Sequence, residues 1–175
     1  LNKNYALVIT TNSGLWRYLI GDTIRFTSLS PYRIKVTGRT KHHINVFGEE
    51  LMVENTDAAI AKTCALFDCE IVDYTVAPVF MSETQKGSHE WIIEFKNPPE
   101  DVEKFSMILD ENIQSLNSDY EAKRYNNMTL NPLVLNVARK NLFYDWLKQN
   151  DKLGGQHKIP RLSNDRNYLE SLLNL

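Results

Sequence analysis

The chain has 175 residues, 42% of them hydrophobic and 24% charged, a balance typical of a globular protein rather than a disordered one. Its formal net charge is −2 and its Lys and Arg residues are spread thinly, so it lacks the basic cluster that a nucleic-acid-binding surface needs. No apolar run approaches the ~20 residues that span a bilayer, and no signal peptide is visible, so we expect neither a membrane nor a nucleic-acid partner.

Residues 1–38 are predicted to form an antiparallel β segment. Runs rich in β-branched and aromatic residues follow one another at short intervals, and turn-forming residues separate them, as in hairpins. Since the sequence starts with Leu1 and is already strand-like at Tyr5, we expect the chain to be cut from a longer protein. The predicted strands are residues 5–11, 15–20, 23–28 and 33–37.

Residues 43–175 are predicted to form an α+β domain, in which a small sheet packs against helices. Ile60, Cys64 and Phe67 recur at helical spacing. A second apolar stripe follows Asp101, whose side chain can cap a helix. The predicted strands are residues 69–80, 90–95 and 133–137, and the predicted helices are residues 53–67, 102–116, 141–148 and 165–173.

The two cysteines, Cys64 and Cys69, favour a reducing compartment. A secreted protein of this size that depends on disulfides usually carries more cysteines, so we expect a cytoplasmic protein. A zinc site would need further Cys or His ligands nearby, and we therefore interpret both cysteines as small core residues. His42 and His43 are adjacent in a predicted strand and would point to opposite faces, so we expect no metal site here.

The first stretch that could carry chemistry is Gly14-Leu-Trp-Arg-Tyr-Leu-Ile-Gly-Asp22. A predicted strand ends there in a Gly-Asp turn, which would present the carboxylate of Asp22 at the edge of the sheet. A carboxylate can accept two hydrogen bonds at once, which suits the 2′- and 3′-hydroxyls of a ribose. Gly-Asp is also a common turn, so an aspartate that only forms the turn is the alternative.

The second stretch is Thr37-Gly-Arg-Thr-Lys-His42, between the predicted β segment and the α+β domain. Polar residues with a glycine suit a hinge that absorbs large changes in φ and ψ, so residues 39–42 are the predicted hinge. An ordinary linker is the alternative. Glu49 and Glu50, which follow shortly afterwards, are expected to be a solvent-exposed pair at the start of a helix.

The third stretch is Leu153-Gly-Gly-Gln-His-Lys-Ile-Pro-Arg161. Two glycines let a backbone approach a ligand closely, and Lys158 precedes a segment that Pro160 stiffens. A lysine on such a loop can meet phosphate oxygens as a point charge. A solvated loop lysine is the alternative, and the spacing is not that of a Walker phosphate-binding loop.

These three motifs, in this order, resemble those of the plant auxin-responsive (Gretchen Hagen) acyl acid amido synthetases and their bacterial relatives. That family is part of the adenylate-forming superfamily, with the acyl-CoA synthetases, the peptide-synthetase adenylation domains and firefly luciferase. The resemblance covers essentially all 175 residues, and Gly-Gly-Gln-His-Lys-Ile-Pro-Arg is its most specific motif.

The resemblance implies a mobile C-terminal α+β domain, preceded by a β segment from the end of a large N-terminal domain. In such enzymes ATP and a carboxylic acid give an acyl-adenylate and pyrophosphate, and the amine of an amino acid then forms an amide. By resemblance, Asp22 holds the ribose of ATP, and Tyr18 and Arg39 belong to the nucleotide site. Lys41 takes the pivot position of the hinge, and Lys158 is the catalytic lysine.

The resemblance also implies what this chain lacks. The family's phosphate-binding loop, acid pocket and magnesium ligands belong to the N-terminal domain, on which this chain would pack. We therefore expect the isolated chain to be inactive. Two other functions stay open: a non-catalytic α+β binding module, and a ligase fragment whose acceptor is coenzyme A or a carrier thiol.

Overall fold

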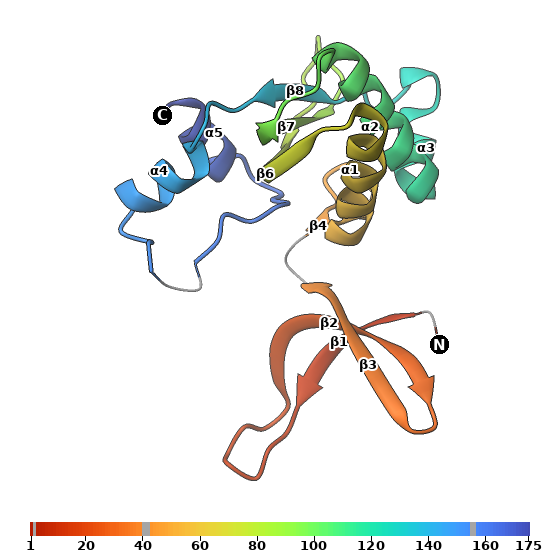
Figure 1. Cartoon of the computed structure of the whole chain (residues 1–175). Coiled ribbons are helices and arrows are strands. Elements are labelled where there is room, and N and C mark those ends of the chain that lie inside the picture. Colours follow the sequence, from red (N-terminus) through yellow and green to blue (C-terminus); the bar gives the residue numbers. More distant parts are fainter. Residues whose placement is uncertain (2, 40–42, 155–156) are drawn as a thin grey trace. The chain divides into compact units, whose positions relative to one another are not determined.

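The computed structural model describes residues 1, 3–39, 43–154 and 157–175 (Figure 1). The chain divides into two compact units, Leu1–His43 and Ile44–Leu175. The predicted pivot residue, Lys41, lies outside the described residues, as do Thr40 and His42. The described part of the chain holds no helix that is both long and apolar enough to cross a membrane.

The first unit is a three-stranded antiparallel sheet in the order β1-β2-β3. The predicted Gly-Asp turn is wrong, because β2 continues through Gly21 and Asp22 without reversing direction. The register of the β1–β2 pairing shifts in this region, which indicates a β-bulge, and Gly21 has a φ of 89° that favours glycine. The strands are β1 (Asn4–Ile9), β2 (Tyr18–Leu29) and β3 (Tyr32–Arg39).

This sheet buries little apolar surface of its own. Ile24 is the buried hydrophobic residue of the unit among those described, whereas Trp16 is 79% exposed and Tyr32 is 76% exposed. A patch of this kind on a small sheet is typical of a surface that another part of a protein covers. The exposed large hydrophobic residues of this unit are Leu1, Tyr5, Val8, Leu15, Trp16, Tyr18, Leu19, Ile20, Leu29, Tyr32, Ile34 and Val36.

The second unit is built on a sheet in the order β6-β7-β8. β6 and β7 are antiparallel, and the short β8 lies parallel to β7 on its other edge. A two-stranded pair, β4 and β5, precedes this sheet in the chain. The strands are β4 (His43–Ile44), β5 (Leu51–Met52), β6 (Glu70–Val79), β7 (Ser88–Asn97) and β8 (Val134–Val137).

Helices cover both faces of this sheet, as Figure 1 shows with α1 and α2 together and α4 and α5 apart from them. The side chain of Asp101 caps α2 by accepting the N–H of Lys104 at 2.9 Å. The predicted α+β class, with a small sheet packed against helices, is confirmed. The helices are α1 (Val53–Phe67), α2 (Val102–Leu116), α3 (Ser118–Arg124), η1 (Tyr125–Asn127), α4 (Leu142–Gln149) and α5 (Asn167–Leu173).

The two faces of the sheet belong to two hydrophobic cores, because neighbouring residues of a strand point to opposite sides. Trp91 of β7 packs in the core with α1 and α2, where its ring stacks on Tyr74 with centroids 5.5 Å apart. Ile92, the next residue, packs in the core with α4 and α5, beside Trp146. The residues of β6 also alternate between the two cores, so each layer of helices contacts a different set of β6 side chains.

The expectation that Glu49 is solvent-exposed is wrong. Its side chain is fully buried, with one carboxylate oxygen 2.8 Å from Nε2 of His89 and the other accepting the N–H of Phe47 at 2.7 Å. Burial alone would raise the pKa of Glu49, but the hydrogen bond and charge of His89 and the backbone N–H donors lower it. Glu50 is exposed, as expected. The charge of Glu49 can be buried because His89, 40 residues further along the chain, pairs with it.

A second set of buried polar side chains adjoins the pair of Glu49 and His89. The ring of His89 stacks on Tyr120 of α3 with centroids 5.3 Å apart. Tyr120 donates its hydroxyl to Asp110 of α2 at 2.6 Å, and Arg124 donates to the same carboxylate at 2.8 Å. Arg124 also donates to the carbonyl oxygen of Leu130 at 2.9 Å. These bonds fix α3 against α2 and against the strand that follows.

We expect Glu49→Ala to lower the free energy of unfolding by about 3–5 kcal/mol, because removing one partner leaves the other buried and unpaired. Since the pKa of Glu49 is lowered in the folded state, its contribution is present above the ordinary Glu pKa of about 4.3 and is lost as pH falls through the folded value. Urea unfolding at pH 7 and at lower pH measures both effects. Glu50→Ala, at an exposed position, is the matched control and should change stability by under about 0.5 kcal/mol. Equal losses in the two variants would contradict the assignment.

Candidate functional site

The segment that follows Lys158 is fixed to the free edge of β6. Val76 donates its N–H to the carbonyl oxygen of Arg161 at 2.8 Å and accepts the N–H of Ser163 at 3.1 Å. This is a parallel pair with Leu162 opposite Val76. Leu162 is buried in the core beneath α1 and α2, so side-chain packing supports the backbone bonds. The predicted catalytic lysine therefore stands just before a rigid attachment point.

The side chain of Arg161 strengthens this attachment. It forms an ion pair with Asp57 of α1 at 2.5 Å and lies 5.3 Å from the ring of Tyr74. Tyr74 donates its hydroxyl to the same aspartate at 2.5 Å, and burial and Asp57 raise the pKa of Tyr74. Both members of the ion pair are substantially exposed, so it contributes about 1 kcal/mol or less. Arg161 is thus committed to holding the segment in place.

Lys158 itself is exposed, as a lysine that meets a ligand must be. Its charge acts on Asp73 of β6, a half-buried carboxylate that accepts the N–H of Tyr74 at 2.9 Å. Burial raises the pKa of Asp73, and the charge of Glu94 raises it further, while Tyr74, Arg161 and Lys158 lower it. Asp73 was not singled out from the sequence, although a charged residue within an apolar strand was a usable signal.

The predicted nucleotide-site residues belong to the first unit. Tyr18, at the start of β2, is 51% exposed, and Asp22 is half-buried at the bulge. Asp22 lies opposite Arg39 in the β2–β3 pairing, so these two positions are brought together on neighbouring strands. Because the two units are described separately, the structure does not join these residues and Lys158 into one site.

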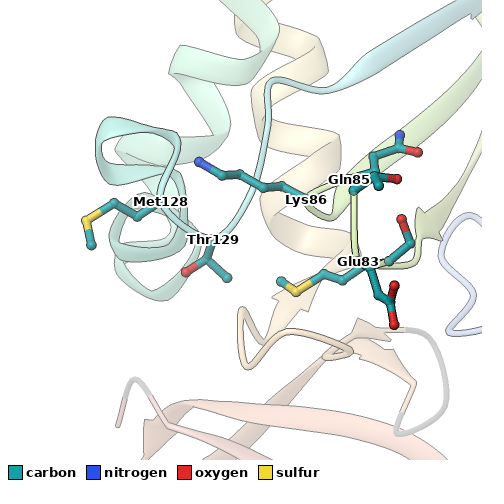
Figure 2. A pocket seen from close by; sticks show the side chains of 8 residues that line it. Glu83, Gln85, Lys86, Met128 and Thr129 are labelled. Atoms are coloured by element: carbon teal, nitrogen blue, oxygen red, sulfur yellow. The ribbon is translucent and has the colours of Figure 1, made fainter.

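Two recesses lie on the surface that the described residues of the second unit form, and Lys158 lines neither of these two. One, of about 410 Å³, lies between the β6–β7 loop and the residues before β8, as Figure 2 shows. Lys86 in that loop donates to the carbonyl oxygen of Asn127 at 2.6 Å, and Met128 lines the same recess. Nothing in this open recess gathers several charged groups around one point.

The other recess, also about 410 Å³, lies between α1 and the start of β6. Cys64 and Cys69 line it together with Arg161. Burial raises the pKa of the Cys64 thiol to about 12, so little thiolate is present at neutral pH. Within the described ranges, no group of three or more His, Cys, Asp or Glu side chains could hold a metal ion. We therefore treat the edge of β6 beside the segment of Lys158 as the candidate site.

Two models of one protein family match the chain. The model of the GH3 family C-terminal domain matches residues 54–167, and that of the GH3 family central domain matches residues 1–39. The chain is 26% identical to indole-3-acetic acid-amido synthetase GH3.3 of Arabidopsis thaliana and 23% identical to GH3.4 of the same plant. Each alignment covers 92% of this chain but only 29% of the relative.

Solved structures show the same fold. A structure of the acyl acid amido synthetase GH3.15 has a TM-score of 0.78 at 22% identity, covering 98% of this chain and 33% of that one. A structure of AtGH3.15 in complex with 2,4-DB has a TM-score of 0.73 at 21% identity, covering 98% and 32%. Because the family's C-terminal model alone spans more than half of the sequence, and its central model accounts for the β segment before it, the chain belongs to the GH3 family.

Proposed function

We propose that this chain is the C-terminal part of an ATP-dependent ligase that adenylates a carboxylic acid and joins it to the amine of an amino acid. The observation that best supports this proposal is the exposed Lys158 on a segment fixed to β6, within a domain that matches the family's C-terminal model. The chain spans 29% of the length of its curated relatives, which are amido synthetases by name. The acid pocket and the phosphate-binding loop would lie in the N-terminal part of the longer protein.

In the first half-reaction an oxygen of the acid attacks the α-phosphorus of ATP, and the bond to pyrophosphate breaks. Negative charge develops on the oxygens around the α-phosphorus, so a cation that arrives there stabilises the transition state more than the substrates. Lys158 would supply that cation. Its compact ammonium group suits oxygens that belong to two different molecules, because it does not require the planar geometry of a guanidinium.

The nucleotide side of the site would come from the first unit. Asp22 would accept hydrogen bonds from the ribose hydroxyls, with Tyr18 and Arg39 beside the nucleotide. Asp22 and Arg39 occupy paired backbone positions on β2 and β3, which favours their acting on one ligand. The magnesium ligands would lie in the N-terminal part of the longer protein, as the family resemblance implies.

The second half-reaction needs room for the amine where Lys158 stood. We infer that the C-terminal domain swings about Lys41 after adenylation, which withdraws Lys158 and exposes the acyl carbon. The exposed apolar side chains of the first unit would pack on the N-terminal domain of the same protein. Two free thiols, Cys64 and Cys69, fit a reducing compartment, and we place the protein in the cytoplasm.

Lys158→Ala in the longer protein should slow acid-dependent pyrophosphate release by roughly 30- to 1,000-fold. Two unit charges about 4 Å apart interact by about 4 kcal/mol at an effective dielectric of 20, and each 1.36 kcal/mol of lost transition-state stabilisation is about a factor of ten. Lys158→Arg should restore the rate only in part, because a planar fork places its charge differently.

Amide formation from synthetic acyl-adenylate is the control for that variant and should proceed at near the wild-type rate. Lys152→Ala is the matched lysine variant, because Lys152 lies over the ring of Trp146 at 4.8 Å within the same part of the domain. Unchanged pyrophosphate release by Lys158→Ala would make Lys158 a solvated loop residue and overturn its assignment. Equal losses in both half-reactions would point to a folding defect instead.

The 175-residue chain alone should bind ATP with a dissociation constant of about 1 mM or weaker. Asp22 could add about two charged hydrogen bonds worth about 1–3 kcal/mol each, and this sum barely reaches the ~4.1 kcal/mol of a millimolar complex. Isothermal titration calorimetry measures the constant directly. A micromolar value would show that this chain holds a nearly complete nucleotide pocket.

A further inference from the structure

Asp73 lies beside the segment that carries Lys158. Leu162 pairs with Val76 in parallel, and Thr75 donates its hydroxyl to the carbonyl oxygen of Pro160 at 2.7 Å. These contacts attach residues 160–163 beside Thr75 and Val76; Lys158 lies two residues before Pro160, and Asp73 lies two residues before Thr75. The attachment therefore keeps Lys158 in the neighbourhood of Asp73, where its charge acts on the carboxylate.

A second carboxylate makes this place unusual. Glu94 of β7 lies directly opposite Asp73, and like charges at such positions repel each other. Glu94 is well satisfied, because it accepts the N–H of Asn141 at 2.7 Å and that of Phe143 at 3.3 Å at the start of α4. Asp73 accepts only the N–H of Tyr74 among the hydrogen bonds that the described residues make.

Two cations lower the pKa of Asp73, but they are not equally available. Arg161 is bound to Asp57 at 2.5 Å on the α1 side of the sheet. Lys158 makes no direct ion pair or hydrogen bond within the described ranges of the chain, so its ammonium group is uncommitted. Asp73 and Lys158 form no direct ion pair among the described residues, so the attraction between them acts over a longer distance.

We propose that Asp73 is a positioning residue for Lys158: its carboxylate attracts the lysine side chain toward the edge of β6 and limits the orientations in which the ammonium group is presented. The catalytic role of Lys158 rests on the proposed function, whereas the attraction between Asp73 and Lys158 does not depend on that function. Limiting the orientations of a charged side chain before it meets its target lowers the entropy lost on reaching the reactive arrangement.

Asp73 should lower the stability of the domain at neutral pH. Because burial raises its pKa above that of an unfolded aspartate, the folded state favours the protonated form, and stability falls as pH rises through the folded pKa. Asp73→Asn should therefore raise the melting temperature at pH 7 by about 1–4 °C, and this gain should shrink in acid. Glu83→Gln, in the exposed β6–β7 loop, is the control and should shift it by under about 1 °C. A lower melting temperature for Asp73→Asn would contradict the prediction that the folded domain disfavours the ionised carboxylate.

The direct test is the titration of Asp73 in the 175-residue chain, followed by carbon-13 NMR of its carboxyl carbon. Lys158→Met should raise the pKa of Asp73 by about 0.5 to 2 units, the range for unit charges about 6 Å apart at dielectric constants of about 80 and 20. Lys158→Arg keeps the positive charge and should hold the pKa within about 0.3 units of the wild-type value. Lys152→Met is the matched control and should leave it unchanged.

Identical titration of Asp73 in the wild type and in Lys158→Met would overturn the proposal. So would an equal shift in Lys152→Met, since it would show a general change of net charge. The measurement uses neither ATP nor an acid substrate, so an inactive longer protein would refute the proposed function without affecting this result. Lys158 is exposed, and the amide spectrum of each variant verifies that it is folded.

Discussion

The backbone pairing between Val76 and residues 161–163 is the contact on which the arrangement of the second unit depends. It joins the end of the chain to a strand 85 residues earlier and so closes the domain. It adds to the contacts that hold α5 against the sheet, where Arg166 donates to the carbonyl oxygen of Pro78 and to Glu90, and Leu169 packs in the second hydrophobic core. The same pairing gives Lys158 a fixed base, so one short stretch of backbone serves both the fold and the proposed chemistry.

Buried charge is the second constraint. Glu49 and His89 are both fully buried, and their pairing ties the segment just after the predicted hinge to the first strand residues of β7. Close packing reinforces the pair: a Cβ added at Gly87 would lie 2.6 Å from the ring of Phe47. No side chain fits at position 87 unless Phe47 moves, and Phe47 donates to the same carboxylate. The entrance to the C-terminal domain is therefore held rigidly, which suits a domain that would move as one body.

The sequence is informative where the determinants are local. Helices α1 and α2 match their predicted bounds because apolar residues recur every three or four positions and Asp101 marks the second start. α3 was missed because its seven residues are mostly polar and Tyr120 is the main sign of a buried face. Gly21-Asp22 was misjudged because a turn and a bulge use the same residue types, and the strand partners decide between them.

The features that give the candidate site its shape are non-local, and the sequence could not predict them. The burial of Glu49 depends on His89, and the position of Lys158 depends on β6, far earlier in the chain. The motif around Lys158 predicts a catalytic lysine through family resemblance, whereas the place of Asp73 beside that segment follows only from the contacts with β6. A charged residue that is buried against a partner far along the chain leaves little sign of its burial in the neighbouring sequence.

The apolar sheet of the first unit has a practical consequence for anyone handling this protein. Its outer strands offer unpaired backbone groups beside exposed side chains such as Trp16 and Tyr32, a combination that promotes edge-to-edge association between molecules. Shortening the chain to begin at Ile44 removes that surface and keeps both hydrophobic cores of the second unit intact. We expect the trimmed domain to associate less in concentrated solution, because the exposed apolar sheet is no longer present.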